Sequence, residues 1–210
     1  MRILITAGPT REAIDPVRYI SNQSSGKMGY ALAEAAEKAG HEVILVSGPV
    51  NLAPPAGVET IAVESSHEMF EAVRDRIGDS VDAAIFCAAV ADYRPKNIAA
   101  EKIKKNSDSM TLEMEKTEDI LGSARSVFGF KGTLVGFAAE THDLEKHAVE
   151  KMQRKGCDLL VANDVSRKDI GFDRDENEVR LFFADGRDER IPMQSKADLG
   201  VALIQKITEL

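Results

Sequence analysis

The chain has 210 residues, 43% of them hydrophobic, and a formal net charge of −8 at pH 7, which allows one buried core and argues against a nucleic-acid partner. Its longest purely apolar run, residues 83–91, is far shorter than the roughly 18 residues of a membrane span, so no membrane partner is expected. Cys87 and Cys157 form neither a metal-ligand pattern nor a disulfide framework, and with no export signal after Met1 they predict a cytoplasmic location.

The first half of the chain alternates short apolar segments with amphipathic ones. Residues 3–5 form an apolar run that stops at a Gly-Pro pair, as expected for a buried parallel strand that enters a loop. Residues 8–25 lack helical periodicity and predict a long loop, whereas apolar side chains recur at helical spacing over residues 27–39. The further elements expected in this half are strands at 43–46, 58–63 and 82–89, and a helix at 65–77 that opens with the capping-box pair Ser65 and Glu68.

The alternation breaks after residue 89 and resumes near residue 134. Residues 91–109 are polar and irregular. The elements expected beyond them are strands at 110–115, 134–137 and 159–161, helices at 120–128, 144–155 and 196–207, and a hairpin over 179–191. The pattern predicts an α/β fold: a Rossmann-like, doubly wound, mostly parallel sheet with a small β-hairpin and flap extension. We expect residues 1–210 to form a single domain.

One glycine-rich segment is a candidate anion site. Residues 24–29, with the sequence SSGKMG, precede a predicted helix, where unpaired backbone N–H groups and the helix dipole favour an anion. The segment matches neither a Walker motif, because Ser21 and Met28 stand at positions that require other residues, nor the NAD fingerprint. Gly26 and Gly29 could therefore belong to a phosphate loop or be turn and packing glycines.

Other candidate residues follow predicted strands. Residues 87–94 and 163–164 come where open α/β sheets bind ligands, although a packed loop and an Asx turn are the alternatives. The basic cluster at 101–105, EKIKK, is either a solvated surface or an anion contact. The four histidines lack metal-binding spacing and no nucleophile signature occurs, which disfavours a metalloenzyme or a hydrolase.

Five segments, in this order, resemble phosphopantothenoylcysteine synthetase. They are ITAGPTREAIDPVRYISNQSSGKMG at 5–29, CAAVADYRP at 87–95, EKIKK at 101–105, VGFAAET at 135–141 and ANDV at 162–165. The resemblance extends over nearly the whole chain. It implies a ligase of coenzyme A synthesis that joins 4'-phosphopantothenate to L-cysteine through an acyl-cytidylate, consuming CTP and releasing pyrophosphate and CMP. In many bacteria this domain follows a flavin-dependent decarboxylase domain, which is absent from these residues, so no flavin is expected.

The resemblance also assigns residues. Lys102 matches the lysine that contacts the triphosphate and stabilises charge during activation, and Asn22 matches an asparagine near the acyl group of the substrate. The nucleotide-binding residues that it implies are Asp92, Lys102, Glu118, Asp119, Ile120, Leu121, Phe137, Lys151, Lys155, Ala162, Asn163 and Asp164. Glu118 stands where the family often has proline. The residues implied for phosphopantothenate and its phosphate are Ser24, Ser25, Gly26, Ala88 and Ala89.

The family further implies a flap, a metal ion and a second copy. Residues 106–110 are expected to close over the acyl-nucleotide and to exclude water. Mg²⁺ is expected because it offsets triphosphate charge, with ligands that are unknown, and the chain is expected to form a homodimer. Two other functions stay open on the same fold: a non-catalytic nucleotide-sensing module and an NAD(P)-dependent reductase.

Overall fold

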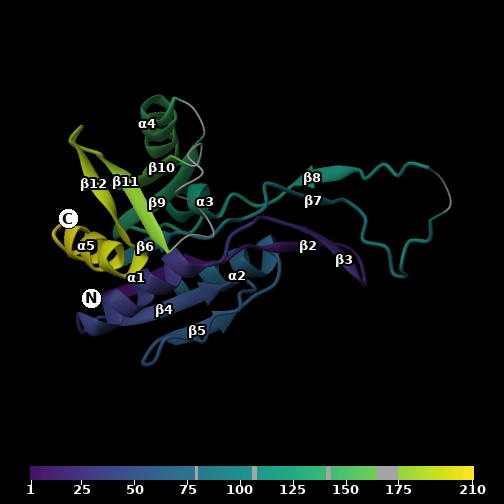
Figure 1. Ribbon diagram of the computed structural model, residues 1–210, viewed down its shortest axis with the longest axis horizontal. Coiled ribbons are helices and arrows are strands. Elements are labelled where there is room, and N and C mark those ends of the chain that lie inside the picture. Colours follow the sequence, from purple (N-terminus) through teal and green to yellow (C-terminus); the bar gives the residue numbers. More distant parts are fainter. Residues whose placement is uncertain (79, 106–107, 141–142, 165–174) are drawn as a thin grey trace.

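The computed structural model describes residues 1–78, 80–105, 108–140, 143–164 and 175–210. Eight strands form one sheet in the order β12-β11-β10-β9-β6-β1-β4-β5, with helices on both of its faces (Figure 1). Six of these strands run parallel, and they are β1 (Arg2–Ala7), β4 (Glu42–Ser47), β5 (Glu59–Ala62), β6 (Ala83–Phe86), β9 (Thr133–Glu140) and β10 (Leu159–Asp164). The other two, β11 (Glu176–Phe183) and β12 (Asp188–Ser195), add an antiparallel hairpin beside β10.

The strand order defines a doubly wound fold. Taken in chain order, the parallel strands follow the 3-2-1-4-5-6 arrangement, and the direction of winding reverses between β1 and β6. At such a reversal the loops after the two strands diverge and leave a crevice at the carboxyl ends. The predicted fold class is confirmed.

Within the part of the chain that the structure describes, five helices pack against the sheet. Alternate side chains of β1 point to opposite faces, so Ile3 and Ile5 belong to one core while Leu4 belongs to the other. The first core is covered by α1 (Lys27–Lys38) and α5 (Lys196–Thr208), and the second by α2 (Ser66–Arg76), α3 (Ile120–Ser126) and α4 (Leu144–Lys155). Because both faces are covered, the central strands β1, β4 and β6 are nearly continuous buried runs and lack polar alternation, whereas the edge strand β5 is only partly buried. None of the helices within the described residues is long and apolar enough to cross a membrane.

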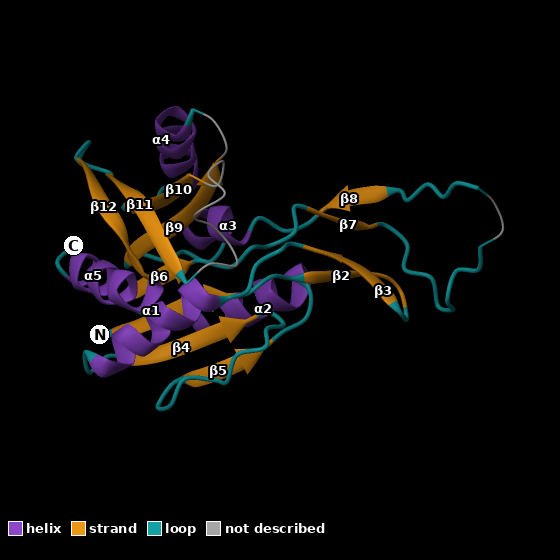
Figure 2. Cartoon of the chain, in the orientation of Figure 1, coloured by secondary structure: helices purple, strands orange, loops and turns teal. Residues whose placement is uncertain are grey.

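Two short antiparallel pairs extend away from the sheet (Figures 1 and 2). They are β2 (Arg11–Asp15) with β3 (Arg18–Ser21), and β7 (Tyr93–Pro95) with β8 (Met114–Lys116). We call residues 11–21 and the described part of 93–116 the arm. The predicted long loop at 8–25 is wrong in this part, because a hairpin forms there. Its turn is set by the side chain of Asp15, which accepts hydrogen bonds from the backbone N–H groups of Val17 and Arg18.

The remaining elements agree with the sequence to different degrees. Helix α4 has the predicted bounds, whereas the strand predicted at 110–115 is wrong in position, since β8 occupies Met114–Lys116. Ser65 caps α2 by accepting a hydrogen bond from the backbone N–H of Glu68 at 3.2 Å. The Glu68 carboxylate accepts a hydrogen bond at 2.6 Å from the N–H of Glu64, the residue before the cap.

We expect Gly29→Ala to lower the free energy of unfolding by about 1–3 kcal/mol, the range for overpacking a close contact. A Cβ atom at Gly29 would lie 2.5 Å from the Cβ and 3.1 Å from the Cα of Ala7, so α1 would have to move away from β1. Urea denaturation measures the change. Gly78→Ala is the matched control, because no described atom lies within 4 Å of its added Cβ. Equal stabilities of the two variants would contradict the role of Gly29 as a packing glycine.

Candidate functional site

Two cavities open at the carboxyl ends of the parallel strands. The first cavity has a volume of about 440 Å³ and is lined by Gly8, residues 22–29, residues 87–90, Asp92, residues 137–139, Lys151, Asn163, Asn177 and Lys196. The second cavity has a volume of about 610 Å³ and is lined by Thr6, Met69, Phe86, Ala88, residues 90–93, residues 116–121, Phe137, Lys151, Arg154 and Lys155. Five residues line both cavities: Ala88, Val90, Asp92, Phe137 and Lys151. The two cavities therefore adjoin at the ends of β6 and β9.

The loop between β3 and α1 forms one wall of the first cavity. Gly26 is the N-cap of α1 and adopts a left-handed conformation with φ 76°, without a side-chain hydrogen bond to the helix. A Cβ atom at Gly26 would lie 2.6 Å from a methyl group of Val50, so no larger residue fits without movement. The first turn of α1 thus presents backbone N–H groups and the positive end of the helix dipole to the cavity, which favours an anion there.

Hydrogen bonds join the loop after β6 to the end of β1 and to the residue that follows it. The N–H of Ala89 donates to the carbonyl of Gly8 at 2.9 Å, and the N–H of Ala88 donates to the Thr6 hydroxyl at 3.2 Å. Asn22 adds a third connection, because its amide Nδ2 donates to the Ala89 carbonyl at 2.9 Å. The position of Asn22 is therefore fixed against the small residues that follow β6.

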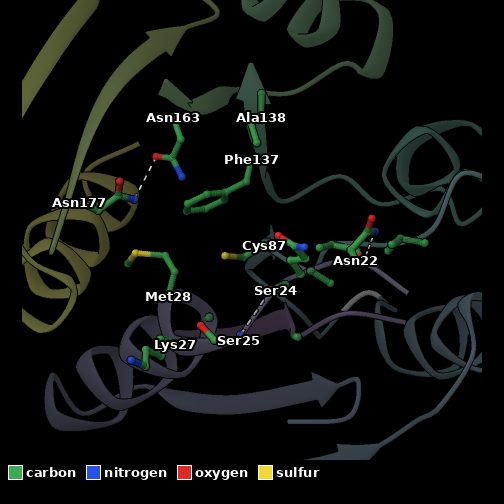
Figure 3. A pocket seen from close by; sticks show the side chains of 18 of the residues that line it. Asn22, Ser24, Ser25, Lys27, Met28, Cys87, Phe137, Ala138, Asn163 and Asn177 are labelled. Atoms are coloured by element: carbon green, nitrogen blue, oxygen red, sulfur yellow. Dashed lines mark hydrogen bonds between the residues drawn. The ribbon is translucent and has the colours of Figure 1, made fainter. Parts of the chain in front are cut away.

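The opposite end of the first cavity comes from the last third of the chain. Figure 3 shows Asn163 and Asn177 facing one another there, with Phe137 and Cys87 between them and Asn22. The amide of Asn177 donates to the side-chain oxygen of Asn163 at 3.1 Å. Lys196, the first residue of α5, lines the cavity with 7% of its surface exposed.

Several polar residues that line the first cavity were not singled out from the sequence, among them Lys27, Asn177 and Lys196. Lys27 lies inside the quoted glycine-rich motif, and it donates to Asp175 at 2.7 Å. The sequence gives a weak indication for Lys196, because a lysine at the first position of a helix is unfavourable beside the positive end of the helix dipole. Asn177 carries none, because its place depends on how the β11–β12 hairpin docks beside β10.

Charged pairs surround the second cavity. Lys155 donates to the carboxylate of Asp119, whose other oxygen accepts the N–H of Gly122 at 3.0 Å and so caps α3. Burial raises the pKa of Asp119, but the hydrogen bonds from Lys155 and Gly122 outweigh it and hold the pKa below its usual value. The ammonium group of Lys151 donates to the backbone carbonyl of Phe137 at 2.9 Å, at the boundary between the cavities.

Glu118 is held by two partners at the edge of the second cavity. Its carboxylate accepts from Arg94 at 3.2 Å and contacts Nδ1 of His67 at 2.9 Å. Burial raises the pKa of Glu118, but hydrogen bonds, including the one with His67, and the Arg94 charge outweigh it and leave a lowered pKa. Glu118 therefore makes side-chain contacts with two neighbouring segments at this edge of the cavity.

The structure brings most of the expected residues to the cavities. Those in the first cavity are Asn22, Ser24, Ser25, Gly26, Ala88, Ala89 and Asn163. Those in the second cavity are Glu118, Asp119, Ile120, Leu121 and Lys155. Four expected residues line both cavities, namely Ala88, Asp92, Phe137 and Lys151. Ala162 is buried within β10, and the side chain of Asp164 lies outside the described part of the structure.

Lys102 and the predicted flap lie elsewhere. Lys102 is exposed on the arm and does not line either cavity. Of the flap at 106–110, residues 106–107 fall outside the described residues and 108–110 are exposed. The roles of both stay predictions.

No three His, Cys, Asp or Glu side chains within the described ranges converge to hold a metal ion. Mg²⁺ is commonly bound by one or two carboxylates together with substrate phosphates, and this arrangement does not need a protein cage. Asp92 is an exposed carboxylate that lines both cavities. It fits a divalent ion that is shared with the phosphate groups of a bound nucleotide.

Comparison with protein families and curated proteins gives one consistent result. Residues 1–210 match the family DFP, the DNA/pantothenate metabolism flavoprotein C-terminal domain. The chain is 51% identical over 210 residues to the coenzyme A biosynthesis bifunctional protein CoaBC of Vibrio parahaemolyticus, covering 99% of this chain and 52% of that protein. It is 49% identical over 212 residues to CoaBC of Bacillus subtilis, covering 99% and 51%. The chain thus spans about half the length of the curated relatives that it matches.

Solved structures share the fold. The crystal structure of the C-terminal domain of CoaBC is 43% identical, with a TM-score of 0.84, and the match covers 99% of this chain and 94% of that one. A DNA/pantothenate metabolism flavoprotein from Streptococcus pneumoniae is 25% identical with a TM-score of 0.84, covering 100% and 99%. A mutant of Cab2 in complex with phosphopantothenate-cysteine is 15% identical, with a TM-score of 0.79 and coverage of 99% and 85%, which shows likeness of fold alone.

We expect the Cys87 thiol to be unreactive although it lines the first cavity. Burial raises its pKa to about 12, against a smaller opposing effect of the Lys196 charge. At pH 8, iodoacetamide should modify it on the order of 10³-fold more slowly than free cysteine, because the thiolate is the reactive form. Mass spectrometry of the folded protein measures the rate, and Cys87→Ser assigns the site. Labelling at the rate of free cysteine would contradict the raised pKa of Cys87.

Proposed function

Because the chain belongs to the family of the DNA/pantothenate metabolism flavoprotein C-terminal domain, we propose that it is a ligase of coenzyme A biosynthesis that joins 4'-phosphopantothenate to L-cysteine. The observation that carries this proposal is the pair of adjoining cavities at the strand ends, which share five lining residues. Two ligands bound side by side could react at that boundary.

The nucleotide is CTP in this proposal, and it occupies the second cavity. Four cationic side chains line that cavity, namely Lys116, Lys151, Arg154 and Lys155, although the chain as a whole carries a net charge of −8. Cations of this kind suit a triphosphate. The 4'-phosphopantothenate occupies the first cavity, where the first turn of α1 supports its phosphate. Its carboxylate then lies near the shared residues Asp92, Phe137 and Lys151.

The reaction has two steps. A carboxylate oxygen of 4'-phosphopantothenate attacks the α-phosphorus of CTP, an oxygen–phosphorus bond forms, and pyrophosphate leaves. The amine of cysteine then attacks the acyl carbon, the carbon–nitrogen bond forms, a proton leaves the nitrogen, and CMP departs. Positioning and charge stabilisation supply the acceleration for such transfers, so a side-chain nucleophile is not needed. The raised pKa of Cys87 agrees with a reaction that uses no side-chain nucleophile.

Lys102 and Asn22 are the residues to which we assign catalytic roles. The role of Lys102, to stabilise the charge on the triphosphate during activation, rests on its place in the EKIKK motif, because its side chain lines neither cavity. Asn22 donates a hydrogen bond to the acyl oxygen during the attack of cysteine. Its Nδ2 has two N–H bonds, and the bond to Ala89 uses one of them. When Mg²⁺ is bound, with Asp92 as the protein ligand we propose, it offsets the phosphate charge.

We also propose that the chain acts as a homodimer in the cytoplasm and that residues 1–210 form one ligase unit without a flavin. Five large apolar side chains on the arm are exposed, and they are Val17, Tyr19, Tyr93, Ile98 and Met110. Apolar groups gathered on a projecting element are typical of a surface that another subunit covers.

The test of the function is product analysis. The protein is incubated with 4'-phosphopantothenate, Mg²⁺ and either CTP or ATP, with and without cysteine, and the products are identified by mass spectrometry. We expect cysteine-dependent amide formation, and a kcat/KM for CTP above that for ATP. A nucleotide-sensing module would give no ligation, and a reductase would instead oxidise NADPH. An equal or higher kcat/KM with ATP would refute the CTP preference alone.

We expect Asn22→Asp to separate the two steps, because an ionised carboxylate cannot donate a hydrogen bond to the acyl oxygen. The variant should consume CTP in a first turnover, accumulate phosphopantothenoyl-CMP and form little amide, as quenched single-turnover assays would show. Gln23→Glu makes the same charge change at the next lining residue and serves as the control. Proportional loss of both steps, with no trapped intermediate, would instead mean that Asn22 only shapes the loop through its bond to Ala89.

A further inference from the structure

A buried carboxylate joins the two halves of the arm. Asp15 lies at the turn between β2 and β3 with 3% of its surface exposed. One oxygen accepts the backbone N–H groups of Val17 at 3.0 Å and Arg18 at 2.9 Å. The other oxygen accepts Nε of Arg18 at 3.0 Å and the backbone N–H of Ile103 at 3.1 Å. Both oxygens of the Asp15 carboxylate therefore accept hydrogen bonds from residues of the arm.

The contact with Ile103 has a second component. The guanidinium of Arg18 donates Nη2 to the carbonyl of Ile103 at 2.9 Å while it also pairs with Asp15. The N–H and the carbonyl of Ile103 are thus both held, one by Asp15 and the other by Arg18. A further backbone bond, from Ala99 N–H to the Ile14 carbonyl at 3.0 Å, runs between the same two segments.

The N–H of Ile103 belongs to the peptide bond that links Lys102 to Ile103. Holding this peptide group fixes the backbone from which the Lys102 side chain extends. The Lys102 side chain itself is exposed, so its placement depends on that backbone more than on packing. Two N–H donors of the Arg18 guanidinium converge on one oxygen of Asp15, and this planar, charged group suits the task because its geometry admits few alternatives.

We propose that Asp15 is a positioning residue for Lys102: it holds the N–H of the Lys102–Ile103 peptide while Arg18 holds the carbonyl of Ile103, and together they fix the backbone that carries the ammonium group assigned to activation. This inference rests on the proposed function, in which Lys102 stabilises that charge. A displacement of about 1 Å in a preorganised group can cost on the order of 10²-fold in rate. The other possible role of Asp15 is only to hold the arm together.

A double-mutant cycle distinguishes the two roles. The rates of pyrophosphate release in a single turnover are measured for the native protein, Asp15→Asn, Lys102→Gln and the double variant. We expect Lys102→Gln to lose roughly 10²- to 10³-fold, the range for one preorganised charge-stabilising group. Asp15→Asn should lose roughly 10- to 10²-fold in kcat with the KM for CTP changed less than about twofold, because positioning is lost but ground-state binding is kept. The double variant should be no slower than Lys102→Gln alone.

Glu113→Gln is the matched control, since it removes one carboxylate of an exposed arm ion pair, with Lys96 at 2.7 Å. It should leave activity unchanged. If Asp15→Asn does not fold, as judged by circular dichroism, Arg18→Lys replaces it in the cycle, because lysine keeps the charge but loses the fork that contacts Asp15 and Ile103 together.

Additive losses in the cycle would overturn the proposal, because Asp15 would then act independently of Lys102. A near-normal rate for Lys102→Gln would overturn it as well, while leaving ligation by the native protein intact. Failure of the native protein to ligate would instead refute the proposed function on which the inference rests. The three failures are therefore distinct.

Discussion

The pairing of β1 with both β4 and β6 is the constraint on which the rest of this protein depends. Parallel pairing brings the carboxyl ends of these strands to one edge, and the reversal of strand order between β1 and β6 opens a crevice there. The loops that follow are then joined directly, Ala89 to Gly8 and Ala88 to Thr6. Small residues at this edge leave room for ligands. The cavities are thus a consequence of topology before any catalytic side chain is considered.

Electrostatics refine what that edge can hold. Asp119 is paired with Lys155, and Glu118 with Arg94, so two of the carboxylates that line the second cavity already have cationic partners. The lowered pKa of Asp119 keeps it ionised at neutral pH, and the same holds for Glu118. A triphosphate entering the second cavity would compete with Asp119 for Lys155. Such an exchange replaces one ion pair by another and avoids the cost of burying an unpaired lysine.

The sequence predicted the layers of this fold better than its extensions. Helix α4 and the strands of the sheet follow from local periodicity, which is strongest where both faces are buried. The β2–β3 hairpin escaped prediction because Asp15 organises its turn and also binds Ile103, 88 residues away. Asn177 and Lys196 were missed for a similar reason, since they reach the first cavity only when the β11–β12 hairpin and α5 dock. The order of motifs, and not periodicity, pointed to most of the expected residues that the structure gathers around the two cavities.

The arm and the sheet edge meet different physical requirements. Ligand binding needs a fixed and water-excluding surface, and the strand ends provide it because they are anchored in two buried cores. The arm has no comparable core, so its order has to come from hydrogen bonds and ion pairs such as that of Asp15 with Arg18. Interactions of this type are directional, and they hold a backbone segment in one position with little apolar burial. In the arm, buried polar contacts hold the backbone that carries Lys102 in place, whereas at the strand ends apolar packing holds the backbone in place.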